Sequence, residues 1–195
     1  NVNGFTGTTS TGVMLRGATS NRFFNCNFSD NFTNVYFKGF KQKNGAVTAA
    51  VPANDNKFWG CTLNYSVGTA SVYFQVTPLN PNRSPGNNNA FHGCTVETNK
   101  RGILMEAGFY NSFVDNRFEG VTEGAHIKLM EVGFIDQNGS VATSTIDSTR
   151  IINNLFTPGA KDEGMIYIGE EVTSTRLIAN YFSGGTVTVN KGIDT

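Results

Sequence analysis

Two glutamates occupy equivalent places in neighbouring sequence repeats and are the first candidates for chemistry. The segments 94–97 and 116–119 align residue by residue, ending on Glu97 and Glu119. If both segments are strands stacked about 5 Å apart, the two carboxylates face outward side by side. Retaining glycosidases hold their carboxyl groups about 5 to 5.5 Å apart, and mutual repulsion raises one pKa, as a general acid requires. The pair therefore predicts glycoside hydrolysis, with a solvated surface pair neutralised by Arg117 as the alternative.

A second set of polar side chains is expected on the outer face of other short strands. Glu106, His126 and Lys128 are predicted to project from this face. An ammonium group such as that of Lys128 neutralises a uronate, which a polysaccharide lyase needs. The alternative is that the three residues are simply part of a solvated face.

An unusual ladder of side chains is predicted on the same outer face. Its members are Met14, Tyr36, Tyr73, Leu104, Lys128, Tyr167 and Thr188. Three explanations stay open for such an apolar strip. The tyrosines form a platform for sugar rings, the strip packs against another subunit of a trimer, or insertions fold over it.

Three insertions are predicted to leave the repeat at one corner. They span residues 38–55, 77–88 and 131–148. Loops that emerge together on one edge of a solenoid usually build its binding site. The middle insertion carries Arg83 among three prolines, so we expect a shaped ligand wall there rather than a tether.

An internal repeat positions all of these residues. Each copy has the pattern Asn or Thr, any residue, apolar, any two residues, Cys or Asn, any residue, apolar. The copies are 21–28, 56–63, 89–96, 111–118, 149–156 and 175–182. The two apolar positions lie five residues apart, whereas a strand alternates its faces with a period of two, so a corner must separate them. The corner residues are Asn25, Gly60, Gly93, Asp115, Asn153 and Ala179, most of which tolerate a left-handed backbone.

A second short strand follows each copy, and a further one precedes the first copy. These strands begin at Val13, Val35, Val72, Ile103, Ile127, Ile166 and Val187, which are 21 to 39 residues apart. The base period is too short for a helix-bearing repeat. The short period and the abundance of turn formers, with 24 asparagines and 22 glycines, predict an all-β coil of about six to seven turns. The turns are expected to stack at about 4.8 Å, with ladders of like residues inside.

Composition and spacing exclude several functional classes. The 195 residues carry a formal net charge of 0, which argues against a nucleic-acid binder, and no apolar run is long enough to insert in a membrane. Cys26, Cys61 and Cys94 share one repeat position and are expected as free, buried thiols, because stacked Cβ atoms about 4.8 Å apart are too distant for a disulfide. The two histidines have no metal-binding spacing, and no nucleotide motif is present, so we expect no metal and no cofactor.

The units, such as 21–28 followed by 34–37, resemble those of the pectin-lyase-like family of right-handed parallel β-helices. The resemblance is closest to the β-helical modules of bacteriophage tailspikes and covers about residues 13–189. It implies an all-β, right-handed, single-stranded parallel β-helix (a solenoid) that forms one domain over residues 1–195, a fragment of a longer chain. It also implies a homotrimer, in a virion or outside cells, that binds bacterial surface polysaccharide.

Two other functions stay open. One is a polysaccharide depolymerase, acting as a hydrolase through Glu97 and Glu119 or as a lyase through Lys128. The other is a stalk with no ligand. The chain is shorter than the complete β-helical enzymes of the family and lacks an Asp-rich hydrolase motif, which favours binding over catalysis, while the unequal insertions speak against a stalk.

Overall fold

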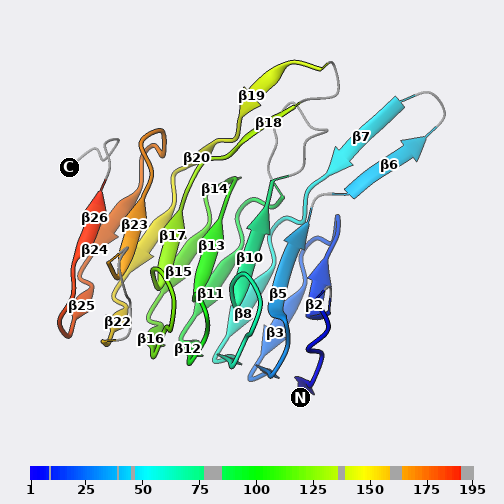
Figure 1. Cartoon of the computed structure of the whole chain (residues 1–195). Coiled ribbons are helices and arrows are strands. Elements are labelled where there is room, and N and C mark those ends of the chain that lie inside the picture. Colours follow the sequence, from blue (N-terminus) through cyan, green and yellow to red (C-terminus); the bar gives the residue numbers. More distant parts are fainter. Residues whose placement is uncertain are drawn as a thin grey trace.

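The protein is built from strands that repeat one circuit. The computed structural model describes residues 1–8, 10–38, 40–44, 47–76, 85–135, 139–158 and 164–189, of which 40–44, 47–50 and 189 are described by their backbone alone. The regular secondary structure of these residues is entirely β, as the sequence predicts. No helix that is long and apolar enough to cross a membrane is found among them. Strand follows strand around a common axis, so that successive circuits stack side by side (Figure 1).

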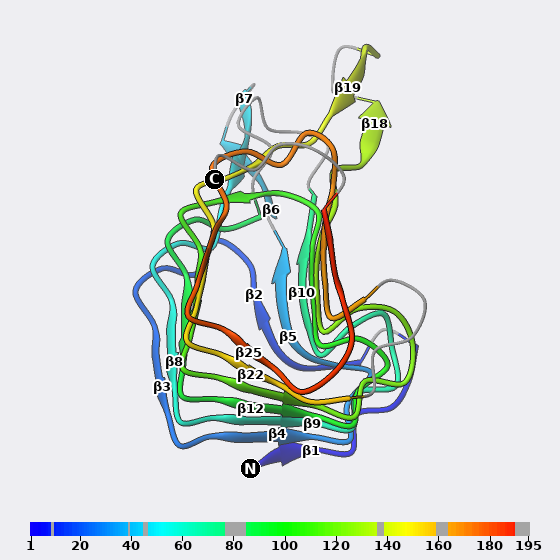
Figure 2. The same cartoon turned by 90° about the vertical axis from the view of Figure 1, so that its left-hand side faces the viewer.

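Three parallel sheets form the walls of this solenoid, and the view in Figure 2 shows them around its interior. Sheet 1 contains β1 (Val2–Asn3), β4 (Asn27–Ser29), β9 (Thr62–Asn64), β12 (Thr95–Glu97), β16 (Arg117–Glu119), β22 (Leu155–Phe156) and β25 (Tyr181–Phe182). Sheet 2 contains β2 (Thr11–Leu15), β5 (Thr33–Lys38), β10 (Val72–Gln75), β13 (Ile103–Met105), β17 (Ile127–Leu129), β23 (Ile166–Ile168) and β26 (Val187–Val189). Sheet 3 contains β3 (Arg22–Phe24), β8 (Lys57–Trp59), β11 (Ala90–His92), β15 (Ser112–Val114), β21 (Arg150–Ile152) and β24 (Arg176–Ile178). The seven strands of sheet 2 are the seven second strands that the sequence predicts.

The inward ladders have the predicted register. In sheet 3, Phe23, Phe58, Phe91, Phe113, Ile151 and Leu177 are paired strand to strand. The rings stack because parallel strands hold identical side chains at one spacing: Phe58 and Phe91 lie 4.5 Å apart between centroids, with an interplanar angle of 3°. Sheet 2 repeats this with Phe37 and Phe74, 4.1 Å apart. Stacked aromatic and aliphatic ladders from the three sheets therefore form one continuous core.

The corners between sheets 3 and 1 use the backbone conformation that the sequence predicts. All six predicted corner residues have positive φ, between 50° and 60°. Ala179 adopts φ 51° although its Cβ makes this conformation costly, by roughly 1–2 kcal/mol. The bend is therefore set by the geometry of the coil and is tolerated even where the local residue does not favour it.

Asparagine side chains tie the corners together from the inside. After the corner between sheets 3 and 1, Asn116 donates to Phe91 O at 3.0 Å, while Asn154 Oδ1 accepts from the Asn116 backbone at 2.9 Å. Asn180 repeats this role on the next circuit. These bonds form a hydrogen-bonding ladder that runs from circuit to circuit. A second ladder before sheet 3 contains Asn21, Asn56, Asn89 and Asn111.

Hairpins extend the circuit at one corner. β6 (Phe40–Asn44) pairs with β7 (Val47–Val51), and β18 (Gly133–Ile135) pairs with β19 (Val141–Thr143), both antiparallel. Both hairpins project from the same edge of the solenoid (Figure 1). A short parallel pair, β14 (Gly108–Phe109) with β20 (Ile146–Asp147), lies at the same edge. Two of the three predicted insertions therefore leave from one corner, and most of the third, residues 77–84, lies outside the described residues.

The three cysteines are free thiols, as expected. Cys61 and Cys94 are buried, whereas Cys26, nearer the end of the ladder, is half-buried. Burial, together with the neighbouring Cys61, raises the pKa of Cys26. The neighbouring Cys61 and burial raise the pKa of Cys94, so the Cys94 thiol stays protonated.

Candidate functional site

The outer ladder of sheet 2 is the predicted one. Strand pairing places Met14, Tyr36, Tyr73, Leu104, Lys128, Tyr167 and Thr188 in register. Met14 is exposed and the tyrosines are half-buried, but only 5% of Leu104 is exposed. Leu104 therefore belongs to a covered part of the face and separates the N-terminal tyrosines from Lys128.

Tyr36 and Tyr73 form a stacked pair. Their ring centroids lie 5.3 Å apart at an interplanar angle of 2°. Since stacking occupies one face of each ring, the remaining face of Tyr36 is turned toward the β2 side of the sheet, where Met14 is its neighbour in register. The pair therefore offers one tyrosine face and not a broad aromatic platform.

Hydrogen bonds fix both tyrosine hydroxyls. The Tyr36 hydroxyl donates to Gln75 Oε1, and the Tyr73 hydroxyl donates to Glu106 Oε1 at 2.5 Å. Glu106 Oε2 accepts from the Val76 backbone at 3.0 Å. Burial and the nearby Glu106 raise the pKa of Tyr36 to about 12, and burial with the Glu106 hydrogen bond raises that of Tyr73. Both phenols are neutral donors, and Glu106 serves to position Tyr73.

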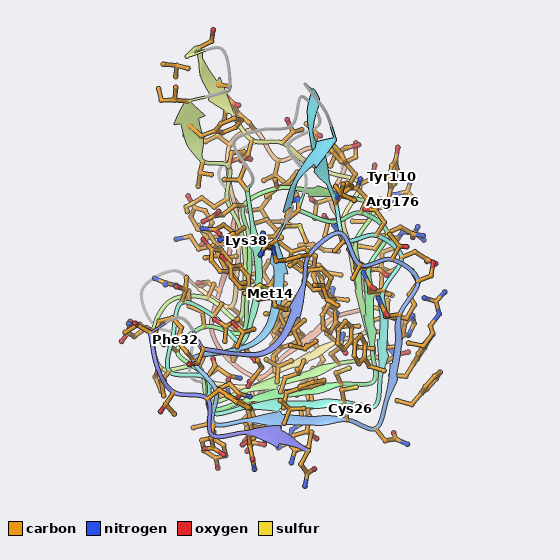
Figure 3. The ribbon with its side chains drawn as sticks, turned by 90° about the vertical axis from the view of Figure 1, so that its right-hand side faces the viewer. Met14, Cys26, Phe32, Lys38, Tyr110 and Arg176 are labelled. Atoms are coloured by element: carbon orange, nitrogen blue, oxygen red, sulfur yellow. The ribbon has the colours of Figure 1, made fainter. Side chains whose placement is uncertain are left out.

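A hollow of about 340 Å³ lies over the N-terminal strands of this face. Figure 3 labels three of its lining residues, Met14, Phe32 and Lys38. The lining combines apolar and polar groups, with Thr11, Thr33, Tyr36, Tyr73 and Gln75 among the other residues. The Lys38 ammonium lies 5.6 Å from the Tyr36 ring centroid. Hydroxyl, amide and ammonium groups beside aromatic carbon are the groups that bind a hydroxylated ligand.

The C-terminal part of the face carries a separate pair. Lys128 Nζ lies 4.9 Å from the ring centroid of Tyr167, its neighbour in register. This cation–π contact holds the ammonium over the ring. Glu106 follows β13 and Lys128 lies within β17, so these two predicted residues do come from adjacent strands of one face.

The placement of His126 on the exposed face is wrong. Its side chain is 0% exposed, and Nε2 lies 2.9 Å from Thr157 O. The ring packs against Phe118 and Phe156. Burial lowers its pKa, so the imidazole is neutral. His126 has the outward parity of Lys128 but precedes β17, where the chain bends and encloses it.

Glu97 and Glu119 lie on sheet 1, opposite each other in register as the sequence predicts. Both are half-buried. Arg117 forms an ion pair with Glu119, whereas Lys100 pairs with Glu123 at 3.0 Å. One carboxylate of the pair is thus neutralised from its own strand. The role of the two glutamates as acid and nucleophile stays a prediction.

Arg83 lies outside the described residues. In the described part of the chain, no group of three or more histidine, cysteine, aspartate or glutamate side chains is arranged to hold a metal ion.

Sheet 3 carries outer-face residues that the sequence reasoning did not select. Phe24 and Trp59 stack at 4.7 Å with an interplanar angle of 7°, and 62% of Phe24 is exposed. Beside them, Arg22 and Lys57 are partners in register, as are Arg150 and Arg176. The signal was present in the aligned repeats, because the cations occupy the variable position directly after the Asn or Thr.

Known proteins give no further guide to the site. Comparison with protein-family models, with curated proteins and with solved structures yields no match. The assignment of function therefore depends on the geometry of the faces.

Proposed function

We propose that the protein is a polysaccharide-binding module whose glycan lies in the hollow on the outer face of sheet 2. The single observation that carries this proposal is the hollow of about 340 Å³ bordered by the Tyr36–Tyr73 stack. Its polar groups are hydroxyls, an amide and one ammonium, which suit hydrogen bonding to sugar hydroxyls. Tyr36 supplies the apolar surface against which sugar C–H groups pack.

The finer features of the proposal come from the resemblance in the sequence. We take the coil as right-handed with six to seven turns, of the pectin-lyase-like kind, and the module as part of a phage tailspike or tail fibre that binds host cell-surface polysaccharide. In this proposal three copies assemble, and weak contacts are multiplied by the trimer. Light scattering for molar mass tests the assembly, with three chain masses expected.

Glycan binding is tested by calorimetric titration with a panel of bacterial capsule and lipopolysaccharide glycans. Tyr36→Ala is expected to weaken binding about tenfold or more, because it removes an aromatic ring that lines the hollow. Tyr181→Ala is the matched control, since Tyr181 is an exposed tyrosine on sheet 1. An equal loss of affinity in Tyr36→Ala and Tyr181→Ala contradicts the proposal. So does the absence of binding to any glycan by the folded protein, and that result supports a stalk.

Depolymerisation is the second candidate function, favoured by the register of Glu97 with Glu119. Release of reducing ends from the same glycans detects it. Loss of this release in Glu97→Gln or Glu119→Gln, with binding retained, makes the protein a hydrolase. Release that persists in both variants removes the two glutamates from the mechanism.

A further inference from the structure

A second hollow, of about 400 Å³, lies at the corner that leads into sheet 3. Tyr110, Ser148, Arg150, Ser174 and Arg176 line it. Figure 3 shows Tyr110 and Arg176 near each other at this corner, away from Met14 and Lys38 of the sheet 2 hollow. The lining combines two guanidinium groups with three hydroxyl groups.

The two arginines are direct neighbours. Arg150 in β21 and Arg176 in β24 are partners in register, so their backbones lie about 4.8 Å apart. Both side chains are exposed, and within the described part of the chain neither forms an ion pair with a carboxylate. Two like charges held side by side repel each other unless an anion lies between them.

The same sheet contains an equivalent pair of cations that is bridged by a carboxylate of the protein itself. Arg22 and Lys57 occupy the equivalent positions in β3 and β8. Asp55 bridges them, with Oδ2 at 3.0 Å from Arg22 and Oδ1 at 3.2 Å from Lys57. Hydrogen bonds from these two cations hold the pKa of Asp55 below its usual range.

Ser174 occupies the place that Asp55 has in the equivalent pair. Each stands two residues before the second cation of its pair, at a corner with positive φ, 57° at Asp55 and 50° at Ser174. The coil therefore repeats the cation pair and the corner, but replaces the bridging carboxylate by a hydroxyl. The carboxylate of Asp147, the residue before Ser148, accepts from Thr173 at 2.8 Å and from Ser148 at 3.0 Å. Among the described residues it forms no ion pair with Arg150 or Arg176.

We infer that this hollow binds an oxyanion, a phosphate, sulfate or carboxylate group, between Arg150 and Arg176 in the position equivalent to the Asp55 carboxylate. Guanidinium groups bind such groups through paired, charge-assisted hydrogen bonds. The Tyr110 hydroxyl, which also lines the hollow, is a further donor. This inference does not rest on the proposed function, because the site lies on another face and uses other residues.

The test is calorimetric titration at low ionic strength with inorganic phosphate and with sulfate, because salt screens exposed charges. Arg176→Gln and Arg150→Gln are each expected to weaken binding about tenfold or more, the loss expected for one charge-assisted pair. Arg22→Gln is the matched control and is expected to bind as the parent does, since its charge is already paired. Equal effects of Arg176→Gln and Arg22→Gln, or no binding by the parent protein, overturn the inference.

A second variant supplies the missing carboxylate. Ser174→Asp is expected to abolish phosphate binding, and Ser183→Asp, at an exposed serine beyond β25, is its charge-matched control. Thermal unfolding verifies that both variants are folded. If Ser174→Asp does not fold, the titrations of Arg150→Gln and Arg176→Gln test the inference instead. Unchanged phosphate binding by folded Ser174→Asp overturns the inference.

The source of the oxyanion is identified by a polymer comparison. Dextran sulfate is titrated against neutral dextran, with Arg176→Gln as the variant. Binding of dextran sulfate at least about tenfold tighter per sulfate than inorganic sulfate, lost in Arg176→Gln, supports the site and identifies an anionic polysaccharide as its ligand. Equal affinity for both forms of sulfate, also lost in the variant, supports the site and identifies a free anion. Dextran sulfate binding that Arg176→Gln leaves unchanged overturns the inference.

Discussion

Removing one asparagine from the inner ladder is expected to destabilise the whole coil. Asn89 is 1% exposed, and its side chain serves three circuits. Its Oδ1 accepts from the Asn56 backbone at 2.9 Å, and its Nδ2 donates to Ala53 O at 3.0 Å and to Asn111 Oδ1 at 3.1 Å. Alanine at this position cannot replace any of these bonds.

The cost follows from the groups that lose their partners. In Asn89→Ala the Asn56 N–H and the Ala53 carbonyl, both in the interior of the corner, are left without their hydrogen bonds. A buried polar group without a partner costs about 1–3 kcal/mol, so two such groups lower the free energy of unfolding by about 2–6 kcal/mol. The loss is measured by urea denaturation with the slopes of parent and variant compared.

Asn88→Gly is the control for this experiment. Asn88 is the adjacent corner residue, is exposed and has φ 53°, which glycine adopts without strain. We expect its effect to stay within about 0.5 kcal/mol. A loss below about 1 kcal/mol in Asn89→Ala would refute the argument that the asparagine ladder satisfies the corner backbone.

Two further substitutions test the core and the electrostatics. Phe91→Ala is expected to lower the free energy of unfolding by about 3–5 kcal/mol, because it removes a 1% exposed ring from a continuous stack. Phe24→Ala, at an exposed ring, is the control and is expected to cost less than half as much. Similar losses for the two variants in urea denaturation would show that the inward assignment of Phe91 is wrong. Burial and two neighbouring glutamates raise the pKa of Glu131, so its folded form binds a proton more tightly than its unfolded form, and its charge weakens folding above the folded pKa. Glu131→Gln is therefore expected to raise the melting temperature at pH 7 and to lose this advantage as the pH falls toward about 4.5, and a difference independent of pH would count against it.

The interior of the coil was predictable from the sequence because the repeat itself encodes it. Inward positions are filled by side chains of similar size that stack at one strand spacing. The alignment of Phe58 with Phe91 in the repeat therefore predicts that the two rings are in contact. Corner positions were predictable for the same reason, since residues with left-handed preference recur at one offset. Parallel β-structure turns each repeated position into a ladder.

The outer faces were less predictable, because the exposure of a residue depends on which segments cover it. The alternation of side chains along a strand gives the direction of a side chain but not what covers it. His126 has outward parity but is enclosed at a bend, and Leu104 is covered within a face whose neighbours are partly exposed. The Tyr36–Tyr73 stack shows another limit: the sequence placed both residues on one face, but the orientation of their rings follows from packing. Partners such as Glu106 for Tyr73 depend on rotamers as well as register.

The solenoid also determines what kind of ligand its faces suit. Every outer position recurs at about 4.8 Å along the axis, so wherever two successive circuits both carry a functional group at one position, the two groups lie in register. Tyr36 with Tyr73 on sheet 2 and Arg150 with Arg176 on sheet 3 are pairs of this kind. A polymer that runs along the axis contacts several circuits at once, and its second contact is intramolecular, which multiplies weak individual affinities. A small molecule engages only one or two circuits, and this difference favours an extended ligand on both faces.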